Sequence, residues 1–195
     1  MTKTIQPPRG RSRKPRPRSP WRWVGFAVAP LALAVLVAVS VLSETDAAEI
    51  DQAIPFELSA ADGQIVSLDE TLAQGDALLY FSMGVGCDGC FAQIPELDTA
   101  VAERGMSLVP IMIDPATLVA AEAARFGIDG PILIDPGAEV SAAYGMVGIY
   151  GHGDRPSHSF ALVRQSGEIA WVRHYAEMFV PAESLLDELD AALGT

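Results

Sequence analysis

A run of 20 residues without a charged side chain, residues 23–42, divides this chain into two unlike parts. As a helix the run would be about 30 Å long, which is the thickness of the hydrocarbon core of a bilayer. Eight of the 13 basic residues precede it, whereas all 25 acidic residues follow it. Because positively charged flanks stay in the cytoplasm, we expect a single-pass anchor in the cell membrane, with the amino terminus inside and the rest of the chain outside.

The apolar run could instead belong to a cleaved signal peptide or to a buried helix. A signal peptide would be cleaved near Thr45-Asp46-Ala47, but the run is longer than the roughly 7 to 15 apolar residues of a usual signal. A buried helix of a globular domain seldom has so long a charge-free run. An anchor and a signal peptide would both export the acidic part of the chain, and the length of the run favours the uncleaved anchor.

The sequence therefore predicts four segments: a basic, proline-rich disordered arm at residues 1–22, the transmembrane anchor at 23–42, a linker at 43–53 and a folded domain at 54–195. The arm has few apolar residues to offset the entropy of ordering it. From residue 43 onward, five arginines stand against 25 acidic residues, a net charge of -20. Such a domain would be repelled by phosphate backbones, so we expect no nucleic acid among its partners.

Apolar runs and turn residues predict an α/β fold for the exported domain. The turn Asp62-Gly63 separates two short strands that should form a hairpin. Alternating strands and helices, followed by a second hairpin and a last helix, predict a central mixed sheet that helices cover on both faces. The expected strands are 56–58, 64–68, 77–82, 106–113, 131–134, 159–163 and 169–174, and helices are expected after Cys87, at 117–126, at 139–144 and after Pro181.

The only two cysteines, Cys87 and Cys90, lie at the start of the helix expected after strand 77–82. Unpaired N–H groups and the helix dipole stabilise a thiolate at such a position. Cys87 is therefore the predicted nucleophile, and Cys90, one turn further and more buried, is the predicted resolving thiol. A passive disulfide is the alternative, although closing so short a loop gains only about 2 kcal/mol. The three histidines lack zinc-site spacing, so no metal is expected, and thiol–disulfide exchange requires no organic cofactor.

Asp88 lies between the two cysteines. Its negative charge should oppose a second negative charge on Cys87 and so raise the pKa of that thiol. This predicts a reducing couple, with a potential below the roughly -120 mV of a strongly oxidising dithiol protein.

The strand 77–82, the Cys-x-x-Cys pair and Pro95, five residues beyond Cys90, resemble the thioredoxin superfamily, in which that proline kinks the active-site helix. The chain is more closely similar to the membrane-tethered TlpA/ResA-type and AhpC/TSA redoxins, over about residues 54–193. The resemblance implies a thioredoxin-like fold and exchange of disulfides with protein thiols. It also implies a membrane electron donor that restores the dithiol, without an organic cofactor.

Three further residues are expected to bind substrate by this resemblance. Gly86 occupies the place where those families carry an aromatic residue before the first cysteine. Counting back from the second hairpin places the family's cis-proline at His158, whereas the nearby proline is Pro156. His158 could donate to the Cys87 thiolate or bind the substrate chain, and it could also simply cap a strand end.

A peroxiredoxin-like peroxidase of the AhpC/TSA type is the alternative function. Tyr144-Gly145 and an arginine-containing loop before strand 159–163 resemble the bacterioferritin-comigratory branch of the peroxiredoxins. Peroxidatic cysteines sit in the pattern Pro-x-x-x-Thr-x-x-Cys, and here Tyr80 and Gly84 replace the proline and the threonine. The hydroxyl that would orient a peroxide is missing, so a thiol–disulfide oxidoreductase is the predicted function and an antioxidant peroxidase the alternative.

Overall fold

The computed structural model describes residues 51–194. The predicted arm and the predicted anchor lie outside these residues, as does most of the predicted linker. Within the described part of the chain, no helix has the length and apolar character that crossing a bilayer requires. The described residues form one unit of the chain.

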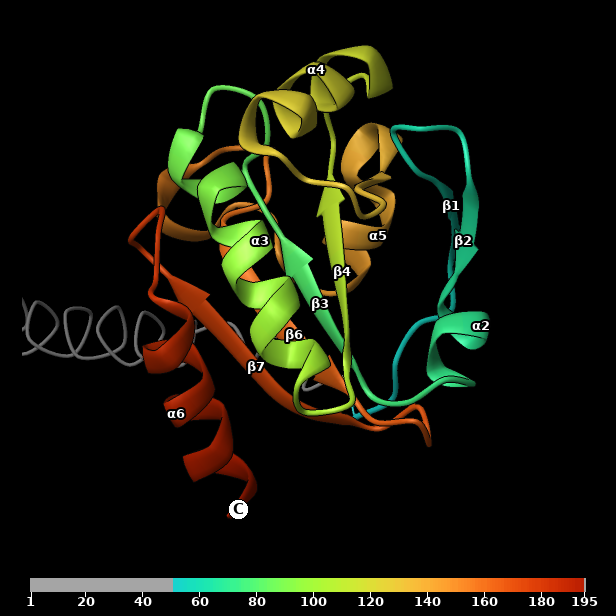
Figure 1. The fold of residues 1–195 in the computed structure, drawn as a ribbon, viewed down its shortest axis with the longest axis vertical. Helices are drawn as coiled ribbons and strands as arrows, with labels where there is room; N and C mark the ends of the chain where they lie inside the picture. The colour runs from blue at the N-terminus through green and yellow to red at the C-terminus, as the bar shows by residue number, and fades with distance from the viewer. Residues whose placement is uncertain (1–50, 195) are drawn as a thin grey trace, which may run out of the picture. The chain divides into compact units, whose positions relative to one another are not determined.

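A five-stranded mixed sheet forms the centre of this unit, in the order β5-β4-β3-β6-β7 (Figure 1). The central strand β3 pairs in parallel with β4 and antiparallel with β6. The two edge strands are β5, parallel to β4, and β7, antiparallel to β6. The bounds are β3 Ala77–Phe81, β4 Ser107–Met112, β5 Leu133–Ile134, β6 His158–Val163 and β7 Ile169–Tyr175.

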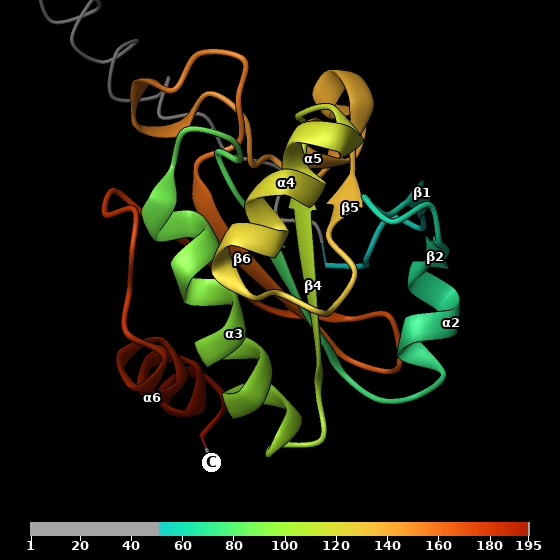
Figure 2. The same ribbon diagram turned by 45° about the horizontal axis from the view of Figure 1, so that its top comes forward.

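Helices cover both faces of the sheet, and the alternation of side chains along β3 separates two apolar cores. Leu78 and Tyr80 point into the core under α3 (Asp88–Ala102), α4 (Ala116–Phe126) and α6 (Ala182–Leu193). Figure 2 shows these three helices in front of the sheet. On the opposite face, Leu79 and Phe81 belong to a second core, to which α2 and the residues that follow α5 contribute. The two remaining α-helices are α2 Leu68–Leu72 and α5 Glu139–Ala143, and short 3-10 helices lie at Pro136–Ala138 and Ile149–Gly151.

The first hairpin forms a small separate sheet from β1 (Glu57–Ser59) and β2 (Ile65–Ser67). Gly63 adopts a φ of 88° in its turn, as the predicted Asp-Gly turn requires. The strand predicted to continue through residue 68 ends earlier, because the Ser67 side chain accepts a hydrogen bond from the Glu70 N–H and caps α2.

The predicted fold class is confirmed: a mixed sheet flanked by helices. Helix α4 ends at Gly127 in the left-handed region, and Pro181 precedes the first residue of α6. Part of the segment predicted as a linker is bonded to the second hairpin, since Ala53 N donates to Gly167 O and Ile169 N donates to Asp51 O.

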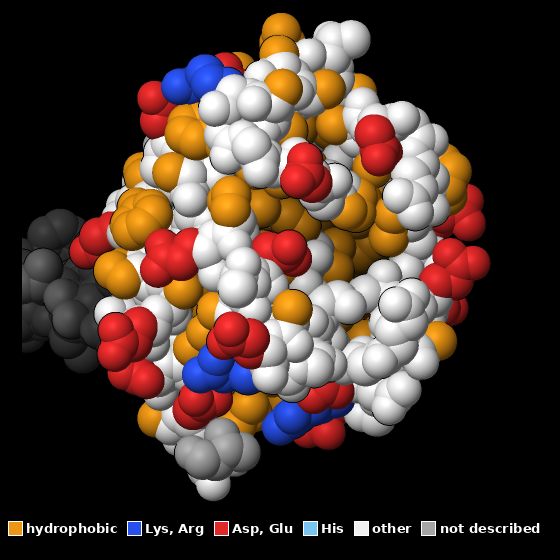
Figure 3. Space-filling model, in the orientation of Figure 1, with side chains coloured by type: hydrophobic (Ala, Val, Ile, Leu, Met, Phe, Trp, Pro, Cys, Tyr) orange, Lys and Arg blue, Asp and Glu red, His pale blue; other side chains and the backbone are white. Residues whose placement is uncertain are grey.

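The face formed by α3 and α4 carries more acidic than basic side chains and is hollowed near its centre (Figure 3). A pocket of about 210 Å³ lies between α3, β4 and residues 127–131. Neither cysteine lines this pocket, so the pocket does not belong to the site described next.

Candidate active site

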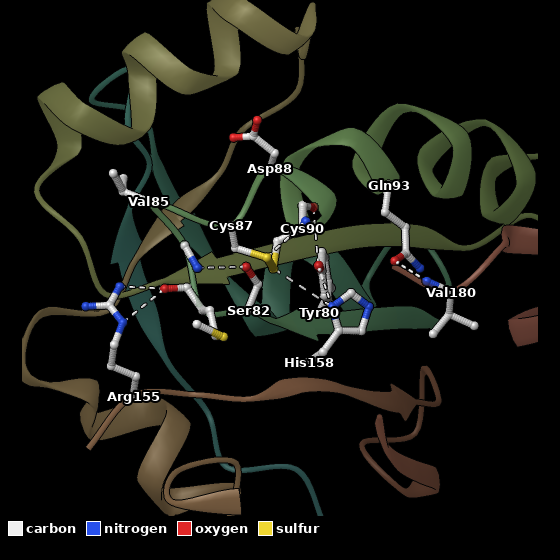
Figure 4. The surroundings of a disulfide bond; sticks show 12 residues. Tyr80, Ser82, Val85, Cys87, Asp88, Cys90, Gln93, Arg155, His158 and Val180 are labelled. Carbon is white, nitrogen blue, oxygen red and sulfur yellow. Dashed lines mark hydrogen bonds between the residues drawn. A yellow bond between two sulfur atoms is a disulfide. The ribbon is translucent and has the colours of Figure 1, made fainter. Parts of the chain in front are cut away.

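The two cysteines form a disulfide at the amino end of α3 (Figure 4). Cys87 is the cap residue of the helix, and its sulfur accepts a hydrogen bond of 3.3 Å from the Cys90 backbone N–H. The first-turn N–H groups of the helix and its dipole therefore lie at the Cys87 sulfur, where they favour a thiolate once the bond is reduced.

The two sulfur-bearing residues differ in their access to solvent. Cys87 is 6% exposed, whereas Cys90 is fully buried. The neighbours Gly86 and Asp88 are exposed. A reaction partner can therefore reach the pair only from the side of Cys87.

An arginine holds the loop between β3 and the first cysteine. Arg155 donates hydrogen bonds to the Met83 carbonyl oxygen and, over 2.6 Å, to the Asp114 carboxylate. The same carboxylate oxygen accepts a 2.8 Å hydrogen bond from Val85 N–H. Because a Cβ at position 84 would collide with that carboxylate, Gly84 leaves room for the contact. Arg155 and Asp114 thus fix the backbone that carries Cys87.

Two polar aromatic side chains lie beneath the disulfide (Figure 4). The hydroxyl of Tyr80 donates to the Cys90 carbonyl oxygen over 3.2 Å and is also 3.2 Å from Nδ1 of His158. That Nδ1 lies 4.0 Å from the Cys90 sulfur. Both side chains are fully buried, so the reacting sulfur of Cys90 rests on a polar cluster that solvent does not reach.

Burial keeps this cluster neutral. It lowers the pKa of His158 to about 4, because an imidazolium would lose its hydration. It raises the pKa of the Tyr80 hydroxyl above its usual range for the corresponding reason. At neutral pH the Cys90 sulfur therefore faces an uncharged imidazole and an uncharged phenol.

Asp88 is paired with a cation that the sequence did not indicate. Arg125 at the end of α4 forms ion pairs with Asp88 and with Glu122. The hydrogen bond from Arg125 lowers the pKa of the Asp88 carboxyl. The positive charge offsets part of the effect that Asp88 was expected to have on Cys87, so a strongly reducing couple is less favoured than the sequence alone implied.

The segment before α6 packs on the first turn of α3. A Cβ at Gly89, inside the Cys-x-x-Cys motif, would lie 2.7 Å from the Met178 carbonyl oxygen, so only glycine permits this approach. Gln93 strengthens the contact by accepting a hydrogen bond from Val180 N–H. Next to this contact Phe179 is 42% exposed, and its side chain begins beside Gly89 of the motif.

The three residues expected to bind substrate lie in different surroundings. Gly86 is exposed, with a φ of 97°, and a Cβ built on it would meet no other atom within 4 Å. Pro156 is buried and pairs with Val147, and no peptide bond in the described residues is cis. His158 faces the sulfur of Cys90 and is closed to solvent. Substrate binding by these three residues stays a prediction.

Sequence reasoning missed the roles of Tyr80, Arg155 and Arg125. Tyr80 alternates with Leu79 along a buried strand, so its direction toward the helix face was readable from the sequence. Asp114 follows β4, and the parallel strand β3 ends just before the loop that carries Cys87. The sequence therefore placed this carboxylate at the same end of the sheet as Cys87. Nothing in the sequence indicated that Arg155 would reach it.

Paired cysteines at the head of a helix that follows a central strand define a thioredoxin-like thiol oxidoreductase. The Redoxin family model matches residues 48–183, and the chain belongs to this family. A search of curated proteins finds no significant match.

Solved structures confirm the fold. Peroxidoxin BcpB from Mycobacterium tuberculosis has a TM-score of 0.60 at 24% identity, over 74% of this chain and 94% of that chain. A putative protein disulfide isomerase from Bacteroides thetaiotaomicron has a TM-score of 0.55 at 22% identity, over 74% of this chain and 89% of that chain. AhpC from Enterococcus faecalis has a TM-score of 0.61 at 19% identity, over 73% of this chain and 90% of that chain. The similar folds thus include a peroxidoxin, an AhpC and a protein described as a putative disulfide isomerase.

Proposed function

We propose that the protein is an extracytoplasmic thiol–disulfide oxidoreductase that reduces disulfides in protein substrates and is held at the cell membrane by residues 23–42. One observation carries the proposal. The disulfide caps α3 with Cys87 at the surface side and Cys90 fully buried, which gives the two sulfurs the unequal access that attack and resolution need.

The reaction begins with the dithiol. The thiolate of Cys87 attacks one sulfur of a substrate disulfide, forms a mixed disulfide and releases the other substrate sulfur as a thiolate. The sulfur of Cys90 then attacks Cys87, the bond to the substrate breaks, and the substrate leaves with both sulfurs reduced. The protein has lost two electrons, and a dithiol donor in the membrane returns them by the reverse exchange.

The surroundings of Cys87 suit a protein substrate. Gly86 has no side chain to obstruct an approaching chain, and the exposed Phe179 offers an apolar contact at the edge of the pair. Asp88, the polar side chain inside the motif, is paired with Arg125, so binding would depend mainly on the backbone and on apolar contact.

Peroxide reduction is the second candidate, because peroxiredoxins are prominent among the similar folds. In that reaction Cys87 would become a sulfenic acid and then condense with Cys90, which releases water. Two features disfavour it. Gly84 has no hydroxyl to orient a peroxide, and the Arg155 guanidinium is occupied by Met83 and Asp114.

The test uses the full-length protein in detergent with a defined protein disulfide, such as those of insulin. We expect the wild type to reduce insulin, Cys87→Ser to be inactive, and Cys90→Ser to accumulate a mixed disulfide that a small thiol releases. Hydrogen peroxide consumption is measured in parallel. Rapid peroxide turnover without insulin reduction or trapping would establish the peroxidase instead.

The location is tested separately. In intact cells, a membrane-impermeant thiol reagent should label Cys87 after mild reduction, and the protein should remain with the membranes. Amino-terminal sequencing should find residues 1–42 still attached. Labelling only after lysis would contradict the exported topology, and a new amino terminus near residue 47 would establish the cleaved signal.

A further inference from the structure

We propose that His158 donates a hydrogen bond from Nδ1–H to the Cys90 sulfur and so stabilises the Cys90 thiolate in the resolving step. The inference rests on the proposed thiol–disulfide exchange and names the group that controls the second sulfur. Nδ1 lies 4.0 Å from the Cys90 sulfur in the disulfide form, at the outer limit of hydrogen-bond distances to sulfur. Among the residues described, the ring's other nitrogen, Nε2, has no hydrogen-bond partner.

The hydrogen-bond network assigns the proton to Nδ1. Tyr80 has one hydroxyl proton, and it donates this proton to the Cys90 carbonyl oxygen. The hydroxyl oxygen is then free to accept from Nδ1–H of His158, 3.2 Å away, so in the disulfide form this one N–H is shared between the Tyr80 oxygen and the Cys90 sulfur. The opposite tautomer would bury an N–H at Nε2 without an acceptor, and buried N–H groups without a partner are rare.

Aromatic rings hold the imidazole in this orientation. The rings of Tyr80, Phe160 and Tyr175 meet His158 edge-on, with centroids 5.0, 5.2 and 6.2 Å away. The backbone of His158 is paired with Tyr175 on β7, so the base of the side chain is fixed as well. A side chain confined in this way keeps its donor aimed at one sulfur.

Titratable groups face the imidazole from three elements: Tyr80 on β3, Tyr175 on β7 and Cys90 on α3. Burial raises the pKa of both tyrosines, that of Tyr175 to about 12. Neither tyrosine then carries a negative charge that would favour an imidazolium, and burial lowers the pKa of His158 itself to about 4. The imidazole therefore stays neutral over the pH range in which the cysteines react. A neutral donor can stabilise a thiolate without giving up its proton.

In the resolving step the Cys90 thiol gives its proton to water, and the thiolate attacks the Cys87 sulfur of the mixed disulfide. The bond between Cys87 and the substrate breaks, and the substrate sulfur leaves with the electron pair and gains a proton from solvent. In the reverse direction a donor dithiol attacks Cys87, and Cys90 leaves as the thiolate. Because the thiolate occurs in both directions, the same hydrogen bond assists both.

Two amide substitutions test the position of the donor. His158→Asn carries its amide near the place of Nδ1, whereas His158→Gln carries it near the place of Nε2. In the full-length Cys87→Ser protein in detergent, the ultraviolet absorbance of the Cys90 thiolate is followed against pH. We expect His158→Gln to raise the apparent pKa of Cys90 and His158→Asn to keep it close to that of the parent.

With both cysteines present, resolution of a mixed disulfide should slow at least about tenfold in His158→Gln and less than about threefold in His158→Asn. The attack of Cys87 on a small disulfide reagent, measured in parallel, should slow less in His158→Gln than resolution does. If His158→Gln does not fold, His158→Leu provides a second side chain without a donor, with the same expected result.

The proposal is overturned if His158→Gln and His158→Asn give the same Cys90 pKa as the parent, or if both slow resolution equally. The thiol titration does not depend on the identity of the substrate. If the protein shows the expected titration but reduces no insulin, the proposed function is contradicted and the proposed hydrogen bond is supported.

Discussion

Arg125, in the last turn of α4, forms an ion pair with Asp88, the residue between the two cysteines. Half of the Arg125 side chain and most of the Asp88 side chain are exposed, so solvent and salt screen the pair. The contact nevertheless places a positive charge next to the one acidic side chain inside the motif. It links the fold of α4 to the electrostatics of the reactive sulfur.

Removing this cation should make Cys87 slightly less reactive. In Arg125→Ala, the charge of Asp88 acts on the thiolate without its partner and raises the pKa of the thiol. We expect the reaction rate of Cys87 with a small disulfide reagent near neutral pH to fall about threefold or less, since solvent and salt screen an exposed pair. Asp88→Asn should change the rate in the opposite direction.

The matched control combines the two changes. Arg125→Ala should change the rate less in the Asp88→Asn background than in the wild type. The difference between its effects in the two backgrounds should shrink at high salt. Equal effects of Arg125→Ala in both backgrounds would show that the pair does not act on Cys87.

The loop that carries Cys87 should depend on Arg155. Arg155→Lys keeps the charge, but a single ammonium cannot reproduce the guanidinium's bonds to both Met83 and Asp114. We expect a loss of about 1–2 kcal/mol in the free energy of unfolding and a lower rate of attack by Cys87, measured by denaturant unfolding and by reaction with a disulfide reagent.

Arg164→Lys is the control for this prediction. Arg164 also pairs with an aspartate, Asp76, but at the opposite end of β3 from the cysteines. It should alter stability modestly and leave the rate of attack unchanged. If the two lysine variants change that rate to the same extent, the hydrogen bonds of Arg155 to Met83 and Asp114 have no special influence on the site.

Phe179 should matter for protein substrates and not for small ones. Its exposed side chain lies beside Gly89, where a substrate chain bound to Cys87 would pass. We expect Phe179→Ser to raise the KM for insulin severalfold through lost apolar contact, with little change in the rate with a small disulfide reagent. Val172→Ser, at an exposed position within β7, is the control and should leave both rates unchanged.

Acid should destabilise the oxidised protein through His158. Its pKa is about 4 in the folded protein and 6.5 as the ordinary value, so between these pH values the unfolded chain binds a proton that the folded protein does not. The contribution of neutral His158 to the free energy of unfolding is fully present above the ordinary pKa. It is lost as the pH falls toward 4, by up to about 3 kcal/mol.

Denaturant unfolding near pH 7 and near pH 4.5 measures this contribution. His158→Leu should lose less stability over that interval than the wild type. Some dependence should remain, because burial also lowers the pKa of His174. An identical loss in the variant and the wild type would show that His158 is not neutral in the fold.

Much of the fold could be predicted because the apolar runs and the turn glycines have local causes. Gly63 and Gly127 ended the predicted elements where the backbone adopts a positive φ. Helix α2 was missed although Ser67 and Glu70 form a capping pattern, because the apolar Ile65 and Val66 before it indicated a strand that continues.

The site was predictable in its covalent part and less so in its surroundings. Cys87 and Cys90 are three residues apart, so a helix start alone fixes their geometry. Arg125 and Arg155 reach the site from segments that are distant in the sequence, and their pairing depends on how α4 and the loop before β6 pack. His158 was placed near the disulfide by counting along the hairpin, but only the structure shows that it faces Cys90.

Selective alkylation of the reduced full-length protein tests the assignment of the two thiols most directly. A limiting amount of iodoacetamide is added in detergent, and the modified peptides are measured by mass spectrometry over time. We expect Cys87 to react at least about tenfold faster than Cys90, because it caps α3 at the surface side while Cys90 is buried. Equal rates, or faster modification of Cys90, would contradict the assignment of nucleophile and resolving thiol.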